Sequence, residues 1–179
     1  MSSSPKSRIL LVYAHRQPAV SRINRALLQA AASLPNVTVH DLAQRYPDLR
    51  IDAAHEQELL RGHDAIVLQF PLYWYSSPAI LKEWQDVALA HGFAYGTGGD
   101  KLRGKKLLVA TTTGGTTEAY QAGGYNHYTL SELLRPFQAT ANIAGMAFQP
   151  IFSVNGVLGV DDAELERAAG AYRQRLFAL

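Results

Sequence analysis

Cysteine is absent from this sequence of 179 residues, and its absence excludes several kinds of chemistry. Without a thiol the chain has no disulfide, no thiolate-bound metal, no iron–sulfur cluster and no cysteine nucleophile. The sequence also lacks a large excess of either charge: 17 Lys and Arg residues stand against 15 Asp and Glu residues, which gives a formal net charge of +2. A nucleic-acid surface needs clustered basic residues, so we expect no nucleic-acid partner. The six histidines include no i, i+4 pair, and we predict no metal site.

Long apolar runs are missing as well. The longest stretch without a charged residue, 136–160, contains Asn142, Gln149, Pro150 and Asn155, so it cannot cross a bilayer as one apolar helix. The first residues, MSSSPKSR, are polar and lack the apolar core of a secretory signal. We therefore expect a cytoplasmic protein. Residues 1–7 are predicted to be a flexible tail and residues 8–179 a single domain.

Apolar, β-branched segments alternate with helical patterns along this domain. Most of the segments are too apolar to have a solvent-exposed face, which is typical of a parallel sheet covered on both sides. Pro150 indicates an edge strand or a bulge in the last of them. The predicted strands are Ile9–Tyr13, Val37–Asp41, Ala65–Phe70, Leu107–Thr112 and Phe148–Val154.

Helical spacing of apolar residues predicts helices over residues 23–34, 80–91 and 165–176. Ser77 is the candidate N-cap of the second helix, with Pro78 at its first helical position, and Asp161 or Asp162 caps the last. Pro136 must kink or split a further helical stretch over residues 129–144. Strand–helix alternation of this kind predicts a doubly wound α/β fold with five parallel strands.

Ligands of doubly wound folds bind beyond the carboxyl ends of the strands, so the loops after the first, third and fourth strands are the informative ones. The first loop, residues 14–24, has neither G-x-G-x-x-G nor a P-loop signature, but it enters a helix N-terminus that favours an anion. The second, residues 70–78, holds three consecutive aromatic residues between prolines, which suit a flat heteroaromatic ring. The third, residues 111–120, offers a glycine pair and free backbone donors. Each loop also has an alternative interpretation. The first would be a capped helix with a surface histidine, the second a set of aromatic core residues, and the third an ordinary glycine turn.

These segments resemble the flavodoxin-like NAD(P)H:quinone oxidoreductase family, over nearly the whole chain from Arg8 onward. The strongest match is FPLYWYSSPAILKEW at residues 70–84, followed by FAYG at 93–96 and TTGG at 112–115. Within that family the chain looks most similar to the bacterial ancillary subunits of glutathione-gated potassium efflux systems. Stretches such as YPD at 46–48 and HGFAYG at 91–96 support this.

The resemblance implies a flavodoxin-like three-layer sandwich and bound FMN, with NADPH or NADH as hydride donor and a quinone as acceptor in a ping-pong sequence. It implies a homodimer in which residues 93–95 complete the partner's pocket. Tyr120 would lie over the redox-active face of the flavin. The family's proton-transfer histidine falls on Asn126, so a one-residue shift is needed for His127 to take that role. The cofactor-binding residues implied are His15, Ser21, Arg22, Ile23, Asn24, Pro71, Leu72, Tyr73, Trp74, Tyr75, Thr112, Thr113, Gly114, Gly115 and Tyr120.

Two other functions remain open on the sequence. The same flavin site would serve a regulatory subunit of a potassium efflux transporter, which would place the protein at the inner membrane face through its partner. A flavodoxin-like electron carrier is disfavoured by the net charge of +2, because such carriers expose an acidic surface. The basic segment 101–106 is interpreted as a solvated loop, the alternative being a contact for an acidic partner or a nicotinamide 2′-phosphate.

Overall fold

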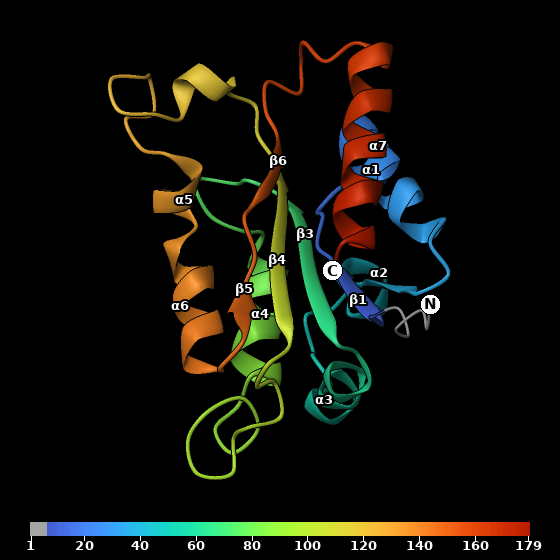
Figure 1. Ribbon diagram of the computed structural model, residues 1–179, viewed down its shortest axis with the longest axis vertical. Helices are drawn as coiled ribbons and strands as arrows, with labels where there is room; N and C mark the ends of the chain where they lie inside the picture. Colours follow the sequence, from blue (N-terminus) through green and yellow to red (C-terminus); the bar gives the residue numbers. More distant parts are fainter. Residues whose placement is uncertain (1–6) are drawn as a thin grey trace, which may run out of the picture.

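The computed structural model describes residues 7–179 and is built around one parallel sheet (Figure 1). The strand order is β2-β1-β3-β4-β5, and β6 also pairs with β4. Every pairing is parallel, as predicted for a doubly wound fold. The strands are β1 (Ile9–Tyr13), β2 (Val37–Asp41), β3 (Ala65–Pro71), β4 (Lys106–Thr112), β5 (Ala147–Phe148) and β6 (Phe152–Val154).

The central strands are buried on both faces. Every residue of β1 and β3 is buried, and so is all of β4 except Lys106, whereas the edge strand β2 is partly exposed. Successive side chains of a strand point to opposite faces, so Leu10 and Val12 enter one hydrophobic core while Ile9 and Leu11 enter the other. The near-continuous apolar sequences of these strands follow from this double covering.

Helices cover both faces of the sheet, α1 and α7 on one side and α3, α4 and α6 on the other (Figure 1). The first core includes Trp84 of α4 and Phe137 of α6, and the second includes Leu27 of α1 and Tyr172 of α7. Within residues 7–179 no helix has both the length and the apolar character needed to cross a membrane. The helices are α1 (Arg22–Ala32), α2 (Leu42–Arg45), α3 (Ala53–Gly62), α4 (Ala79–Ala88), α5 (Leu130–Leu133), α6 (Arg135–Ile143) and α7 (Asp162–Phe177), with 3₁₀ turns η1 (Pro18–Val20) and η2 (Thr117–Ala119).

The prediction of one continuous strand over Phe148–Val154 was wrong. β5 pairs with the start of β4 and β6 with its end, and residues 149–151 between them belong to neither strand. Pro150 lies in this gap and has no N–H to contribute to a ladder, so the strand is interrupted there.

Prolines also set the helix boundaries. Residues 129–144 are split into α5 and α6, with Pro136 in the first turn of α6, as the sequence predicts. Pro78 is the N-cap of α4 rather than its first helical residue, so the predicted cap Ser77 lies one position outside the helix. Asp161, not Asp162, caps α7 by accepting a hydrogen bond from the N–H of Glu164 at 2.7 Å.

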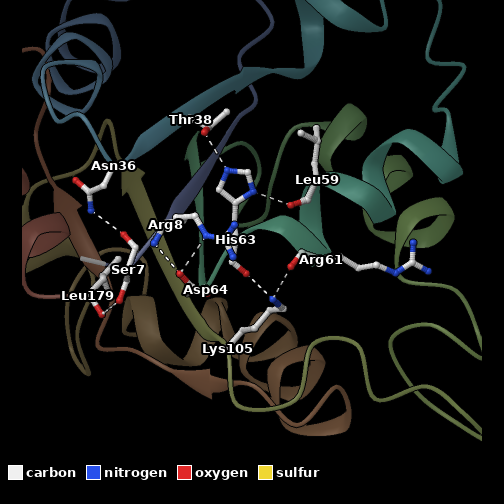
Figure 2. A network of polar contacts seen from close by, with 10 residues as sticks. All are labelled: Ser7, Arg8, Asn36, Thr38, Leu59, Arg61, His63, Asp64, Lys105 and Leu179. Carbon is white, nitrogen blue, oxygen red and sulfur yellow. Dashed lines mark hydrogen bonds and ion pairs between the residues drawn. The ribbon is translucent and has the colours of Figure 1, made fainter. Parts of the chain in front are cut away.

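The basic segment 101–106 is only partly solvated. Figure 2 shows the Lys105 ammonium reaching the carbonyl groups of Arg61, at 3.2 Å, and of His63. Burial lowers the pKa of Lys105, and the charge of Asp64 opposes this effect. Lys105 therefore ties the loop before β4 to the end of α3, a structural role that the interpretation as a solvated loop did not include.

The same network holds the start of the described chain. Asn36 donates a hydrogen bond to the carbonyl of Ser7 at 2.7 Å, and the Ser7 hydroxyl donates one to the carbonyl of Leu179 at 3.0 Å (Figure 2). Ser7, predicted to belong to the tail, is thus fixed to the domain. The remainder of the predicted tail, residues 1–6, lies outside the described residues.

Candidate functional site

His15 is buried just beyond the end of β1. Its Nδ1 accepts a hydrogen bond from the N–H of Gln17 at 3.0 Å, which leaves the proton of the neutral ring on Nε2. Its ring stacks on Tyr13 at 6.1 Å between centroids and meets Tyr73 edge-on at 6.3 Å. Burial lowers the pKa of His15, although the charge of Asp41 opposes the shift. The ring is therefore held as a neutral N–H donor at the carboxyl edge of the sheet.

The N-terminus of α1 follows, with its amide groups uncommitted. Ser21 is the N-cap, but its hydroxyl makes no capping hydrogen bond. Among residues 7–179 the N–H groups of Arg22, Ile23 and Asn24 have no hydrogen-bond partner. An 11-residue helix concentrates partial positive charge at this end, and free N–H groups favour an anion there.

Asn24 joins this helix end to the neighbouring strands. Its Nδ2 donates to the Thr112 hydroxyl at 2.8 Å, and its carbonyl accepts a hydrogen bond from the Gln69 side chain at 3.0 Å. Asn24 is only 2% exposed, yet its Oδ1 has no partner within the described residues. An unpaired buried acceptor costs about 1–3 kcal/mol, so a ligand hydroxyl that donated to Oδ1 would stabilise the site.

The loop after β3 makes a tight two-residue turn. Tyr73 and Ser76 exchange backbone hydrogen bonds of 2.9 and 3.0 Å, with Trp74 and Tyr75 between them at positive φ of 48° and 64°. Such a turn prefers Asn and Gly, and the left-handed conformation costs other residues about 1–2 kcal/mol each. Trp74 is also 93% exposed. Two strained aromatic residues, one almost fully in solvent, are typical of a functional site rather than a stabilising core.

The loop after β4 forms the opposite wall. The N–H group of Gly114 has no hydrogen-bond partner among residues 7–179, whereas the backbone of Gly115 interacts with the Tyr120 phenol and lowers its pKa. A β-carbon at Gly115 would lie 3.0 Å from the Tyr120 ring and 3.3 Å from the Asn126 amide nitrogen, so only glycine fits without displacing a neighbour. The absence of a side chain at Gly115 therefore allows Tyr120 and Asn126 to pack against the loop.

These loops enclose two adjoining cavities of about 320 and 290 Å³. Leu72 and Gly114 line both cavities, which together reach the size of roughly 300–1,000 Å³ that ligand sites occupy. The first cavity is lined by His15, Val20, Ser21, Arg22, Ile23, Asn24, Pro71, Leu72, Tyr73, Thr112, Thr113, Gly114, Val157 and Leu158. The second cavity is lined by Leu72, Trp74, Tyr75, Gly114, Gly115, Ala119, Tyr120, Tyr125 and Asn126.

All predicted site residues except His127 line one of these cavities. His127 is exposed and lines neither, whereas its neighbour Asn126 faces the second cavity. The Arg22 side chain turns toward the loop after β6 and the start of α7, where it donates hydrogen bonds to the carbonyl of Val160 at 2.6 Å and to Asp162 at 2.5 Å.

Tyr120 is half-buried beside the second cavity. Burial raises the pKa of its phenol, the Thr113 side chain opposes that shift, and Tyr75 adds to it. The phenol is therefore a neutral O–H group throughout the physiological pH range.

Sequence reasoning missed Val20, Val157, Leu158, Ala119 and Tyr125 as lining residues. Val157 and Leu158 belong to the loop after β6, which is a further carboxyl end of a strand at the same edge of the sheet. Because β6 pairs with β4, its carboxyl end meets the same edge of the sheet as the predicted loops, and this position is the signal for the loop.

A larger cavity of about 500 Å³ lies between α4 and α6. Its charged lining residues, Lys82 and Asp86, pair with one another at 2.5 Å, and Tyr95 of the predicted partner-binding segment also lines it. Ser76 and Ser77 of the loop after β3 also line this groove, but it shares no lining residue with the other two cavities.

Comparison with known proteins places this geometry in a family. A family model described as a flavodoxin-like fold matches residues 7–176. The glutathione-regulated potassium-efflux system ancillary protein KefG of Cronobacter sakazakii is 54% identical over 143 residues, which is 80% of this chain and 78% of the relative.

Two solved structures are similar over almost their whole length. General stress protein 14 of Treponema denticola, in complex with FMN, has a TM-score of 0.90 and 35% identity, covering 97% of this chain and 99% of the other. An NADPH-quinone reductase of P. pentosaceus has a TM-score of 0.88 and 37% identity, covering 96% of this chain and 99% of the other. The chain belongs to the family of proteins with the flavodoxin-like fold.

Proposed function

We propose that the protein is an FMN-dependent NAD(P)H:quinone oxidoreductase. The observation that carries the proposal is the pair of adjoining cavities, one lined by anion-binding amides and buried polar groups, the other by aromatic rings and open to solvent. The Treponema denticola structure, which contains FMN, and the relative named NADPH-quinone reductase support this assignment.

The residues present fit FMN. The free amides at the start of α1 and the Ser21 hydroxyl suit a terminal phosphate, and the unpaired Oδ1 of Asn24 suits a sugar-alcohol hydroxyl. The backbone of residues 71–75 and of residues 112–115 would border the ring. When bound, the flavin supplies a centre that accepts a hydride and passes it on. Amide donors beside its pyrimidine edge would stabilise the negative charge of the reduced form.

The chain's own residues then bind and orient the two substrates. With the flavin ring against these loops, the mouth of the second cavity would offer exposed aromatic faces, such as those of Trp74 and Tyr125, for one planar ring at a time. Nicotinamide and quinone would therefore occupy it in turn, which gives ping-pong kinetics. The neutral Tyr120 phenol would donate a hydrogen bond to the acceptor. His127 stays a prediction for proton transfer, although its side chain is exposed outside the cavity.

The proposal includes a homodimer. Phe93 and Ala94 are buried, but Tyr95 is 38% exposed and lines the groove between α4 and α6 rather than either cavity of the candidate site. Tyr95 would thus complete the site of a second copy.

An anaerobic visible titration tests the function. FMN-supplemented protein should bind the flavin, and its absorbance band should bleach on addition of NADPH or NADH. Initial rates at several quinone concentrations should then give parallel double-reciprocal lines. A bound flavin that stays oxidised with both nucleotides would refute the reductase, and intersecting lines would refute the ping-pong order.

A second function is favoured by the 54% identity to the potassium-efflux ancillary protein. In this case the same flavin site would serve a cytoplasmic subunit held at the inner membrane face by a potassium efflux transporter. Co-purification with such a transporter, and loss of regulated potassium efflux when the gene is deleted, would support this role. A chain that reduces quinones but never co-purifies with the transporter would contradict it.

A further inference from the structure

Gln69 is a polar residue on an apolar face of β3. It is 0% exposed, and Ala65 and Val67 on the same face belong to the core between the sheet and helices α1 and α7. Burying an amide in such surroundings is unfavourable unless its polar atoms are paired. Its hydrogen-bond partners therefore indicate why a polar side chain stands there.

Both polar atoms of the Gln69 amide are paired, and one partner belongs to the first cavity. Nε2 donates to the carbonyl of Asn24 at 3.0 Å, and Oε1 accepts from the Tyr172 hydroxyl at 3.1 Å. Asn24 lies in the first turn of α1 and lines the cavity together with Thr112, to whose hydroxyl its side chain donates. Gln69 and Tyr172 line neither cavity. A chain of hydrogen bonds thus runs from α7 through β3 to the wall of the first cavity.

The acceptor at one end fixes the direction of this chain. A backbone carbonyl only accepts, so the Gln69 amide must place Nε2 toward Asn24 and Oε1 toward Tyr172. Tyr172 must then donate, and burial raises the pKa of its phenol, which keeps the proton. Tyr172 is 0% exposed and packs against Phe152 at 4.8 Å between ring centroids, so its hydroxyl is held at a fixed place.

The carbonyl that Gln69 holds belongs to the helix turn with uncommitted amides. The N–H groups of residues 22–24 have no hydrogen-bond partner within residues 7–179. On the outer side of the same turn, Arg22 donates to Asp162 at the start of α7, at 2.5 Å. The first turn of α1 is therefore attached to α7 at two places, directly through Arg22 and inside the core through Gln69. Two attachments fix both the position and the rotation of the turn, and with them the directions of its amides.

We propose that Gln69 is a positioning residue for the terminal phosphate of the cofactor, with Tyr172 as its anchor. The inference rests on the FMN binding of the proposed function and names the interaction that selects a phosphorylated flavin over an unphosphorylated one. Gln69 acts through the Asn24 carbonyl, which keeps the amides of the first turn of α1 directed at one point. Donors that are oriented before the anion arrives need no reorganisation, and a hydrogen bond to a charged acceptor is about twice as strong as a neutral one.

Flavin titrations followed by fluorescence quenching separate positioning from stability. Riboflavin has the ring and the sugar-alcohol chain of FMN but no phosphate, so the ratio of the two dissociation constants isolates the phosphate. The double variant Gln69→Met with Tyr172→Phe replaces the amide and the phenol by apolar groups of similar size, and the Asn24 carbonyl keeps its bond within the helix. We expect FMN binding to weaken about 10-fold, riboflavin binding less than about 2-fold, and Tm of the flavin-free protein to stay within about 3 °C.

A single variant and a matched control complete the test. Tyr172→Phe leaves Oε1 of Gln69 without its donor, so FMN binding should weaken about 3-fold while riboflavin binding is unchanged. This variant decides if the double variant does not fold. Tyr46→Phe removes another buried phenol, on the opposite face of the sheet, where it donates to Glu56. It should lower Tm and leave the ratio of the two dissociation constants as in the wild type.

Three results would overturn the inference. An unchanged ratio in the folded Gln69 and Tyr172 variants would show that the phosphate does not depend on this chain of hydrogen bonds. Equal weakening of both flavins would indicate a structural role alone. An altered ratio in Tyr46→Phe would show that the ratio only follows stability. Failure of the proposed function is visible in the wild type before any substitution, as FMN that does not bind or that neither nucleotide reduces.

Discussion

Glu56 is a fully buried carboxylate on α3, with 0% of the residue exposed. It accepts hydrogen bonds from His40 at 2.8 Å, from the Tyr46 hydroxyl at 2.5 Å and from the Trp84 indole at 2.6 Å. These donors come from the end of β2, the end of α2 and the middle of α4. One carboxylate therefore joins four elements on one side of the sheet.

The Glu56→Gln substitution keeps the shape of the side chain and removes its charge. His40 and Tyr46 both donate to Oε1, which the amide oxygen of glutamine can replace. The NH₂ group would then face the Trp84 N–H, donor against donor. An unsatisfied buried donor costs about 1–3 kcal/mol, and hydrogen bonds to a charged acceptor are stronger than those to a neutral one. We expect a loss of about 3 kcal/mol, which lowers Tm by about 6–12 °C for a chain of this size.

The pH dependence gives a second measure of the same effect. Burial raises the pKa of Glu56, but the hydrogen bonds from His40, Tyr46 and Trp84 outweigh it, so the net shift is downward. A carboxyl whose pKa is lower in the folded state stabilises the fold above its unfolded pKa. That stability is lost as the pH falls through the folded pKa. The difference in free energy of unfolding between the wild type and Glu56→Gln should therefore be largest near pH 7 and become smaller in acid.

Urea and thermal unfolding followed by circular dichroism and tryptophan fluorescence would measure both effects. The matched control is Glu58→Gln on the same helix, whose side chain is 77% exposed and pairs with Arg61 at 3.2 Å. This exposed pair should contribute less than about 1 kcal/mol. If Glu56→Gln loses less than about 1 kcal/mol at pH 7, or if its loss is the same in acid, the network does not stabilise the fold as argued.

Three shorter predictions concern the cavities. Trp74→Asn should relieve the strain of the positive φ and raise the free energy of unfolding, measured with urea, by about 0.5–1 kcal/mol. The same substitution should raise the steady-state KM for quinone. A drop in stability would contradict the strain argument. Gly115→Ala should displace the Tyr120 ring, which lies 3.0 Å from the new carbon, and weaken FMN binding about 10-fold with little change in Tm. FMN binding is measured by quenching of the FMN fluorescence, and an unchanged binding curve would refute the close fit. Asp162→Asn should free the Arg22 guanidinium to bind the cofactor phosphate and slow FMN dissociation about 3–10-fold. Faster dissociation would show that the Arg22–Asp162 ion pair itself stabilises the binding site.

Much of the fold was predictable because the central strands β1, β3 and β4 are mainly apolar. The bounds of β1 and β2 agree with the prediction, and β3 and β4 are each one residue longer. Helix α3 was missed because Glu56 occupies one of its buried positions and breaks the apolar period. Asp52, whose side chain accepts from the N–H of His55 at 3.1 Å, was the cap signal that could have revealed it.

The site was predictable as a set of loops but not in its detail. Because ligands of doubly wound folds bind beyond the carboxyl ends of the strands, residues 15–24, 71–75 and 112–115 were expected to lie together. The structure places all three segments around the same two cavities. Sequence spacing could not show that Trp74 and Tyr75 adopt positive φ, since aromatic residues rarely do. It also could not decide between Asn126 and His127, because a one-residue difference in loop register changes which side chain faces inward.

The gap between β5 and β6 has a consequence for how another chain could pair with this edge of the sheet. An open sheet edge presents unpaired backbone groups to any other strand, and such edges lead to aggregation. Here Pro150 and its neighbours break this edge into pairings of only two and three residues, with Lys106–Leu107 and with Ala110–Thr112. The interruption blocks an intermolecular ladder along this edge, so a second chain that docks on this side must do so through helices and their side chains.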